Sequence, residues 1–249
     1  MKTKPKSVSP ITFKALDAGE AEILIYDEID PFWGTGAKDF AEGLKALGAV
    51  TTIHVRINSP GGDVFDGVAI YNQLAQHSAK VIIHVDGVAA SIASVIAMAG
   101  DEIHLAENAI IMIHDPWALT GGDAADHRAK AELLDTVAAT IATTYAARTG
   151  RDTEDIRAMM AAETWMDAAE ALDQGFADLI TEAKRMAARF DPKAFGFKNT
   201  PTGAVDPEET PADVTATEDE PEDVTLAEET PVDLSAHVNR LRLLDLAAE

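Results

Sequence analysis

Two patterns of apolar and polar positions alternate along the chain up to about residue 180. Six short β-rich runs predict strands at residues 21–26, 52–58, 80–86, 102–105, 109–114 and 163–166. Between them, apolar positions with helical spacing predict helices at residues 37–47, 64–77, 89–99, 123–148, 153–161 and 167–174. This strand–helix–strand order is typical of an α/β fold with a largely parallel sheet and right-handed crossover helices.

The pattern stops after Lys198, where the chain becomes strongly acidic. The formal net charge is −23, and residues 199–249 hold 14 acidic residues against two arginines, a net of −12. Such a segment cannot bury enough apolar surface to offset its chain entropy. We therefore expect an N-terminal segment (1–20), a folded domain (21–198), a disordered acidic linker (199–234) and a short C-terminal helix (235–249). Ser235 can cap that helix, although a frayed end fits the same residues equally well.

Composition excludes several classes of protein. The acidic balance argues against a nucleic-acid groove, which needs a cationic face. The chain has no Cys, which excludes disulfides, thiolate metal sites and a cysteine nucleophile. No apolar run reaches the roughly eighteen residues of a membrane helix, and residues 1–7 lack the apolar segment that would follow in a signal peptide. We expect a cytoplasmic protein without metal, cofactor, nucleic-acid partner or membrane partner.

A turn with backbone donors follows the predicted strand at residues 52–58. Its sequence is Asn58-Ser-Pro-Gly-Gly62. Pro60 fixes φ and the two glycines have no Cβ, so successive backbone N–H groups are exposed, as in an anion or oxyanion cradle. As a bare turn motif, this signal is weak.

Ser91 and His114 are the candidate reactive side chains. Ser91 is expected in the first turn of a helix, where unpaired N–H groups favour developing negative charge. On spacing alone, Ser91 and Ser94 are more typical of capping or packing serines. His114 ends a predicted strand, and a lone histidine there is more often structural. A catalytic role for His114 is favoured only because the sequence also contains a candidate nucleophile and the Gly-Gly turn.

The other histidines give no competing site in the sequence. They fall singly on predicted strands, on predicted helices and in the tail: His54, His84, His104, His77, His127 and His237. None makes the i, i+4 pair of a helical metal site. We interpret most of them as surface residues or as satisfied core residues.

Four motifs occur in one order over residues 23–180. They are Arg56-Ile-Asn-Ser-Pro-Gly-Gly62, Gly87-Val-Ala-Ala-Ser-Ile-Ala-Ser94, Met112-Ile-His-Asp-Pro116 and Glu163-Thr-Trp-Met-Asp-Ala-Ala-Glu-Ala171. In this order they resemble the ClpP family of serine peptidases (peptidase family S14), and more closely its phage-encoded head maturation branch. The resemblance implies a ClpP/crotonase-like α/β fold with mostly parallel sheets, crossover helices and a long protruding helix at residues 123–148.

The resemblance also implies a site. Ser91 corresponds to the nucleophile and His114 to the general base, and the N–H groups of Gly61 and Ile92 fall where the family places its oxyanion donors. The Ser, His, acid order and the absence of a Gly-x-Ser-x-Gly elbow argue against an esterase or lipase.

The third catalytic position differs from the usual family pattern. Glu163 stands where the family usually has Asp. A glutamate can still orient His114, but its extra methylene requires a different backbone distance. Asp167 and Asp115 are the alternative acids nearest in sequence.

The resemblance implies a serine endopeptidase that forms an acyl-enzyme and assembles as a ring of seven subunits or two stacked rings. In the phage branch, such enzymes trim capsid or scaffold proteins, in the host cytoplasm or the procapsid. The acidic tail with its end helix suits a scaffold-like or shell-targeting extension, and its removal by self-cleavage is a hypothesis. Cellular members receive substrate from an ATPase docked at N-terminal loops and hydrophobic clefts. Residues 1–21 do not match that loop and residues 29–36 are closer to the phage branch, which argues against an ATPase partner.

Four alternatives remain open. In the first alternative, the chain is a cellular Clp-type subunit that works with an ATPase. In the second, it is a signal-peptide-peptidase-like enzyme with a lysine base such as Lys130. It is a crotonase-like acyl-CoA enzyme, although no pair of active-site acids is apparent. Otherwise it is a non-catalytic scaffold protein that has kept a peptidase fold.

Overall fold

The computed structural model describes residues 11–32, 35–182 and 197–200. The chain divides into two units, Met1–Pro207 and Glu208–Glu249, and all described residues belong to the first. The predicted acidic linker beyond Thr200 and the predicted terminal helix lie outside the described residues. Within those residues, no helix is long and apolar enough to span a bilayer.

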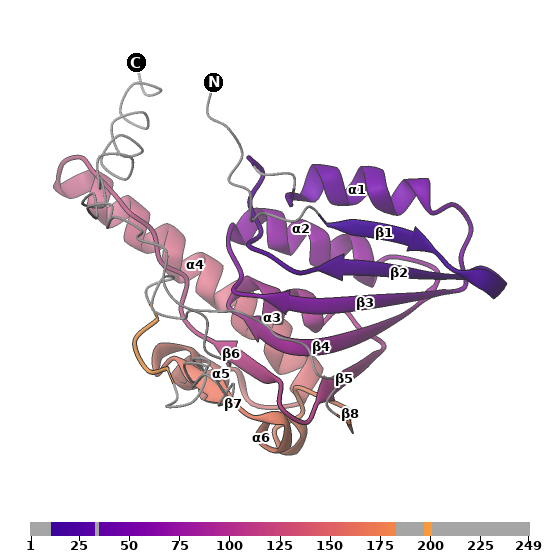
Figure 1. Ribbon diagram of the computed structural model, residues 1–249. Coiled ribbons are helices and arrows are strands. Elements are labelled where there is room, and N and C mark those ends of the chain that lie inside the picture. The colour runs from indigo at the N-terminus through magenta and orange to yellow at the C-terminus, as the bar shows by residue number, and fades with distance from the viewer. Residues whose placement is uncertain (1–10, 33–34, 183–196, 201–249) are drawn as a thin grey trace, which may run out of the picture. The chain divides into compact units, whose positions relative to one another are not determined.

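A mostly parallel sheet forms the centre of the first unit (Figure 1). Its strands are β1 (Thr12–Ala15), β2 (Glu20–Ile25), β3 (Thr52–Ser59), β4 (Lys80–Ala90), β5 (Glu102–Ala106), β6 (Ile110–Ile113), β7 (Thr164–Met166) and β8 (Leu179–Thr181). The order is β1-β2-β3-β4-β5-β8, while β6 pairs with the end of β4 and β7 pairs with β6. Antiparallel pairing occurs between β1 and β2 and between β6 and β7. The predicted α/β class is confirmed.

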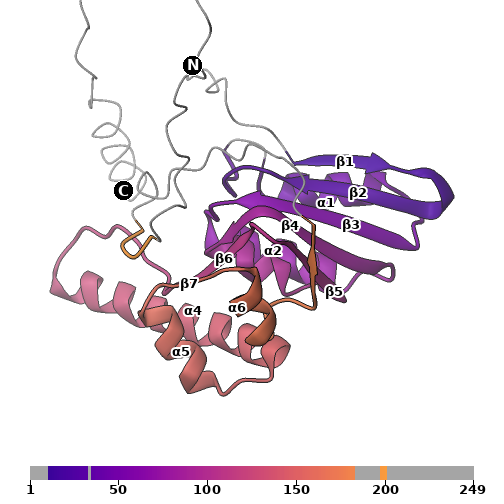
Figure 2. The same cartoon turned by 60° about the horizontal axis from the view of Figure 1, so that its bottom comes forward.

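Helical segments connect most of the strands of this sheet. They are the 3-10 turn η1 (Asp17–Gly19), α1 (Ala37–Ala46), α2 (Val64–Ala75), α3 (Ile92–Ala97), α4 (Ala124–Thr149), α5 (Thr153–Ala161) and α6 (Ala168–Asp173). Both views place α1 and α2 along the same face of β1 to β4 (Figures 1 and 2). In β3 the fully buried apolar side chains are Ile53, Val55 and Ile57, alternating with half-buried ones. One side of the sheet therefore builds the main core, as the period of two requires.

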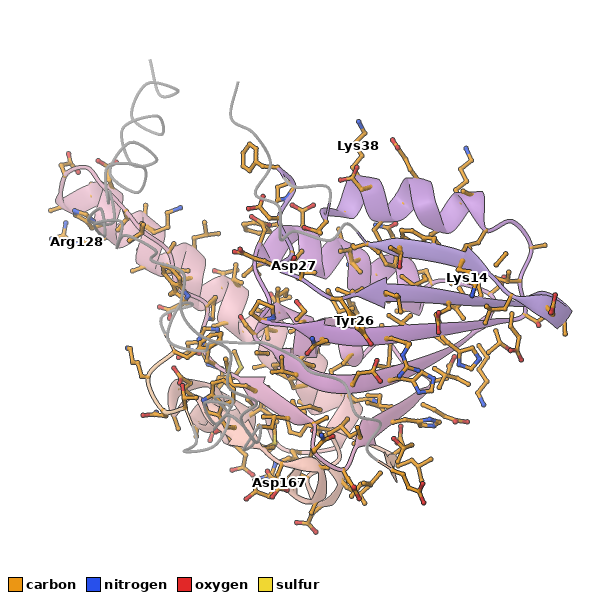
Figure 3. All side chains as sticks on the ribbon, viewed as in Figure 1. Lys14, Tyr26, Asp27, Lys38, Arg128 and Asp167 are labelled. Atoms are coloured by element: carbon orange, nitrogen blue, oxygen red, sulfur yellow. The ribbon has the colours of Figure 1, made fainter. Side chains whose placement is uncertain are left out.

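Helix α4 extends beyond the sheet (Figure 1). It begins at a capping box between Asp123 and Asp126 and ends at Gly150, whose φ of 71° a glycine adopts without strain. Its buried residues all lie in the second half: Ala138, Ile141, Ala142 and Tyr145. The first half is almost entirely exposed, and Arg128 lies near its free end (Figure 3). The predicted long protruding helix is confirmed.

The predicted helix at residues 89–99 is wrong at its start. Ala89 and Ala90 continue β4, because they pair with Ile111 and Met112 of β6. Tertiary pairing overrides the weak helical preference of two alanines. The helix is accordingly only the six residues of α3, and Ser91 is its N-cap.

Candidate active site

Ser91 occupies a strained turn between β4 and α3. Its φ of 54° and ψ of −129° are unusual for a residue with a side chain. A conformation of this kind costs about 1–3 kcal/mol and persists only where the surroundings enforce it. Here the Ser91 N–H donates to the carbonyl of Met112 at 3.0 Å. The turn holds the hydroxyl away from the helix, since Ser91 makes no side-chain cap hydrogen bond to α3.

Ser94 stabilises this turn through hydrogen bonds. Its fully buried hydroxyl lies 2.6 Å from the carbonyl of Ser91, 3.0 Å from that of Met112 and 2.7 Å from the hydroxyl of Tyr145. Tyr145 reaches this point from α4, and burial raises the pKa of its phenol. The structure thus gives the two serines different environments. Ser94 is a packed, hydrogen-bonded residue, and Ser91 lines a cavity.

His114 follows β6 and points at Ser91. Its Nε2 lies 2.8 Å from the Ser91 Oγ. The two residues meet because Ala90 and Met112 are partners in the β4–β6 register, each close to one of them in sequence. Burial holds the pKa of His114 below its usual value, an effect that Glu163 and Asp115 oppose and Lys198 strengthens. The imidazole is therefore neutral at neutral pH and able to accept a proton.

Gly61 and Ile92 are brought together next to Ser91. A Cβ added at Gly61 would lie 2.8 Å from the Ser91 Cβ and 3.1 Å from the Ile92 N. Gly61 has a φ of 98°, so the close approach and the backbone conformation both require glycine. Ile92 is the first residue of α3, where an N–H has no partner inside the helix. The Gly61 N–H donates to the Ser59 Oγ at 3.2 Å in this structure.

Glu163 lies near His114 but has other partners. It follows α5 with a φ of 51°. Its carboxylate accepts the backbone N–H groups of Lys198, at 2.7 and 2.9 Å, and of Asn199, at 2.6 Å. The Trp165 indole N–H also donates to it, at 3.2 Å. Burial raises the pKa of Glu163, but these backbone donors outweigh that effect and hold the pKa below its usual value. Across the described ranges, no hydrogen bond joins Glu163 to His114.

The two alternative acids are engaged elsewhere. Asp167 caps α6 by accepting the Glu170 N–H at 2.9 Å, and it lies at that helix in Figure 3. Asp115 forms an ion pair with Arg157 at 3.3 Å. Asp115 does line a cavity of about 490 Å³ together with His114 and Glu163. Of these acids, Glu163 and Asp115 are therefore close enough to act on the imidazole electrostatically, which agrees with their effect on its pKa.

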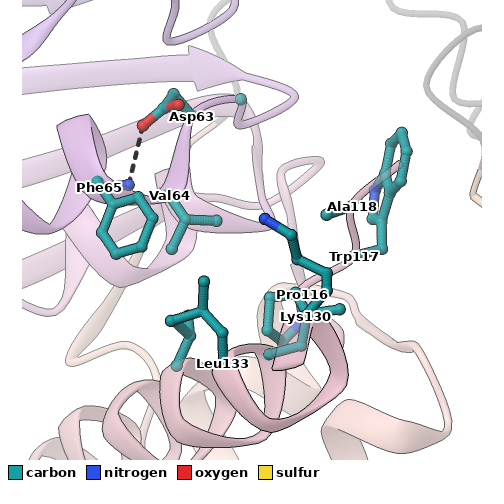
Figure 4. Close-up of a pocket in the computed structure, with 11 residues that line it drawn as sticks. Asp63, Val64, Phe65, Pro116, Trp117, Ala118, Lys130 and Leu133 are labelled. Carbon is teal, nitrogen blue, oxygen red and sulfur yellow. Dashed lines mark hydrogen bonds between the residues drawn. The ribbon is translucent and has the colours of Figure 1, made fainter. Parts of the chain in front are cut away.

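A further pocket, of about 220 Å³, adjoins the cavity that contains Ser91 and His114. The two share the wall formed by Gly62, Val64, Pro116 and Trp117. Apolar side chains line most of it, and the Lys130 side chain enters it from α4 (Figure 4). Lys130 lines this neighbouring pocket rather than the cavity around Ser91. The suggested lysine base is thus offset from the serine.

Three histidines that appear isolated in the sequence form a row on the other face of the sheet. His54 Nδ1 lies 3.1 Å from His84 Nε2, and the rings of His84 and His104 meet edge to face with centroids 5.1 Å apart. At its two ends the row meets carboxylates: His54 Nε2 lies 3.7 Å from the Glu20 carboxylate and His104 Nε2 lies 3.0 Å from that of Glu102. Sequence reasoning missed this row because the neighbours come from three different strands. In the described part of the chain, no group of three or more His, Cys, Asp or Glu side chains is arranged to hold a metal ion.

A serine hydroxyl held against a neutral imidazole at the ends of parallel strands is the arrangement of a serine hydrolase. The sequence model of the Clp protease family matches residues 16–184. The chain belongs to this family and is a serine-type endopeptidase. The family forms homo-oligomeric rings and degrades protein substrates.

Individual relatives agree with this placement. The ATP-dependent Clp protease proteolytic subunit 1 of Leifsonia xyli is 32% identical over 157 residues, which cover 61% of this chain and 80% of that protein. Subunit 3 of Rhodococcus jostii is 34% identical over 164 residues, 65% of this chain and 81% of that protein. A solved ClpP1 mutant from Listeria monocytogenes has a TM-score of 0.59 and 26% identity, covering 66% of this chain and 92% of that one.

Proposed function

We propose that Ser91 is the nucleophile of this peptidase and His114 its general base. The observation that supports this best is the 2.8 Å contact between their reactive atoms on a strained turn. His114 takes the Ser91 proton as Oγ attacks the peptide carbonyl, and it returns the proton to the leaving amine. Water then attacks the acyl-enzyme by the same route.

The N–H groups of Gly61 and Ile92 stabilise the oxyanion in this mechanism. Both groups lie against Ser91, and removing one such donor typically costs about 10²–10³ in rate. The Gly61 N–H must turn from Ser59 toward the substrate oxygen to do so. Glu163 orients His114 and stabilises the imidazolium, since it is a carboxylate in the same cavity.

Labelling with a small fluorophosphonate tests the site directly. Mass spectrometry should find the adduct on Ser91 in the wild-type protein, and Ser91→Ala should remain unlabelled. Ser78→Ala serves as the matched control, because Ser78 is exposed and lines neither cavity that contains His114. Absence of an adduct on Ser91 in assembled protein would overturn the assignment.

We further propose that the enzyme is a phage prohead or capsid maturation protease, assembled as one or two rings of seven, with capsid or scaffold proteins as substrates. The exposed first half of α4 supports the assembly, because a 26-residue helix left half uncovered is suited to contact another subunit. Residues 1–21 support independence from an ATPase, because their sequence does not match the family's docking loop.

A cellular Clp subunit is the second candidate, and the names of the relatives favour it. The two are separated by assaying the purified full chain on an unfolded protein, with and without a Clp ATPase and ATP. Cleavage that needs no ATPase supports the phage role, and strict ATPase dependence supports the cellular one. Recovery of an uncleaved tail in mature particles, equal in amount to the core, would contradict tail removal.

A further inference from the structure

The described residues beyond the part of the chain that matches the Clp protease family lie across the site itself. We call residues 197–199 the C-terminal strap; it lies beside α5 and β7 (Figure 1). The Phe197 ring meets the His114 ring edge to face at 5.4 Å and the Trp165 ring at 5.5 Å. It also packs on the apolar cluster of Val88, Ala90 and Met112. Phe197 thus lines the cavity that holds Ser91 and His114.

The backbone of the strap is also bound, through hydrogen bonds. The Lys198 and Asn199 N–H groups both donate to the Glu163 carboxylate, at 2.6 to 2.9 Å. The Asn199 side-chain amide donates to the Ala162 carbonyl at 2.8 Å. Hydrogen bonds to an ionised carboxylate are about twice as strong as neutral ones. Ring contacts with His114 and Trp165 on one side and hydrogen bonds from three donor groups on the other make a specific binding site for a short peptide.

Binding of the strap in this site uses the hydrogen-bonding capacity of the Glu163 carboxylate. One oxygen, Oε1, already accepts from Lys198, Asn199 and Trp165, and Oε2 accepts from Lys198 as well. A carboxyl oxygen offers about two lone-pair directions, so Oε1 has no room for a further donor. Oε2 keeps one direction, but the strap bonds fix the orientation of the carboxylate, so the strap restricts how Glu163 can accept the outer N–H of His114.

We propose that Glu163, the Ala162 carbonyl and the rings of His114 and Trp165 form a peptide-binding subsite, and that the C-terminal strap is its resident ligand. The subsite takes an aromatic residue followed by two residues with free backbone N–H groups. Protein substrates of this pattern compete with the strap, and its departure frees Glu163 for His114. The inference rests on the proposed function, because it assigns Glu163 to the catalytic site.

Proline substitutions in the full-length chain test the backbone contacts. Lys198→Pro removes the N–H that Glu163 accepts, whereas Lys198→Ala removes the ammonium group and keeps the N–H. Asn199→Pro and Asn199→Ala make the same comparison one residue later. Thr200→Pro is the control for proline itself, since no contact of the Thr200 N–H to Glu163 exists in the described residues.

The first readout is the titration of His114 by NMR, which needs no catalytic activity. The charged groups that act on this ring are Glu163, Asp115 and Lys198. Loss of the strap leaves Glu163 facing the ring, so the His114 midpoint should rise in Lys198→Pro by about 0.5–1 pH unit beyond that in Lys198→Ala. Equal midpoints in the two variants would overturn the subsite.

The second readout is the rate of fluorophosphonate labelling of Ser91. If the strap fills the subsite nine-tenths of the time, its loss raises the rate about tenfold. Lys198→Pro and Asn199→Pro should show this gain, and Thr200→Pro should not. Normal labelling with no gain in either variant overturns the competition. A raised His114 midpoint with no adduct in any variant supports the subsite and contradicts the peptidase assignment instead.

Discussion

His114 Nε2 lies 2.8 Å from Ser91 Oγ across a separation of 23 residues. The contact depends on the β4–β6 register, in which Ala90 faces Met112, and not on any local motif. His114→Ala should therefore reduce the rate of fluorophosphonate labelling by about 10⁴–10⁶, the loss in rate typical of removing a triad member. Lys130→Ala should still form the adduct, because Lys130 lines the neighbouring pocket. Loss of labelling in Lys130→Ala alone, with circular dichroism unchanged, would support a lysine base.

Glu163 should contribute through its charge. We expect Glu163→Gln to lower kcat/KM on a peptide substrate by about 10²–10⁴, because the amide keeps the shape but cannot stabilise the imidazolium. Asp115→Asn is the matched control, since Asp115 lines the same cavity and pairs with Arg157. A larger loss in Asp115→Asn than in Glu163→Gln would move the third catalytic role to Asp115.

The pH profile should reflect the burial of His114. Because burial lowers its pKa below the ordinary 6.5, the acidic limb of kcat/KM should have its midpoint below pH 6.5. Lys198→Ala should move that midpoint upward and Glu163→Gln downward, since the ammonium disfavours the imidazolium and the carboxylate favours it. A midpoint above pH 6.5 in the wild-type enzyme would contradict this environment.

The same pKa shift links His114 to stability. Between its lowered pKa and 6.5 the unfolded chain binds more protons than the folded one, so the unfolding free energy should fall as the pH drops through this window. Urea unfolding at several pH values should show that the unfolding free energy depends less on pH in His114→Gln than in the wild-type protein, because glutamine does not titrate in this window.

The Ser94–Tyr145 contact should carry stability as well as activity. Ser94→Ala leaves the Tyr145 hydroxyl buried without this partner, which typically costs about 1–3 kcal/mol, whereas Tyr145→Phe removes one hydrogen bond at about 1 kcal/mol. Thr143→Ala on the same helix is the control, because its exposed hydroxyl bonds only to the Ala139 carbonyl. Thermal unfolding measures all three, and equal melting temperatures for Ser94→Ala and Thr143→Ala would exclude the supporting role.

The sequence predicted the elements that have strong periodicity or clear caps. Helix α5 was expected at residues 153–161 and is found at Thr153–Ala161, since Asp152 caps it by accepting the Glu154 N–H. The edge strands β1 and β8 were missed, because runs of four and three residues carry too little pattern. At residues 89–90 the pairing with β6 decided the structure, and no local signal shows a pairing across that distance.

The candidate site was predictable in part. The motif order singled out Ser91, His114 and Glu163, and the structure places the first two in contact. The partners of Glu163 were not predictable, because Lys198 and Asn199 are 35 and 36 residues away and form no motif with it. The histidine row was missed for the same reason: adjacency of strands is a property of the sheet order, not of the sequence order.

Gly61 should be intolerant of any side chain. An added Cβ would approach both the Ala90 carbonyl oxygen and the Ser91 Cβ to 2.8 Å, and its φ of +98° would strain any other residue. Gly61→Ala should therefore displace an oxyanion donor and lower kcat/KM by about 10²–10³. Gly121→Ala is the control, because nothing lies within 4 Å of a Cβ there.

A comparison of kcat with KM separates the loss of an oxyanion donor from general damage to the fold. Because the oxyanion forms only after attack, Gly61→Ala should lower kcat and leave KM nearly unchanged. Its far-ultraviolet circular dichroism should match that of Gly121→Ala. A variant with full kcat would show that the Gly61 N–H stays on Ser59, 3.2 Å away, throughout the reaction. The oxyanion would then be held by Ile92 and a donor other than Gly61.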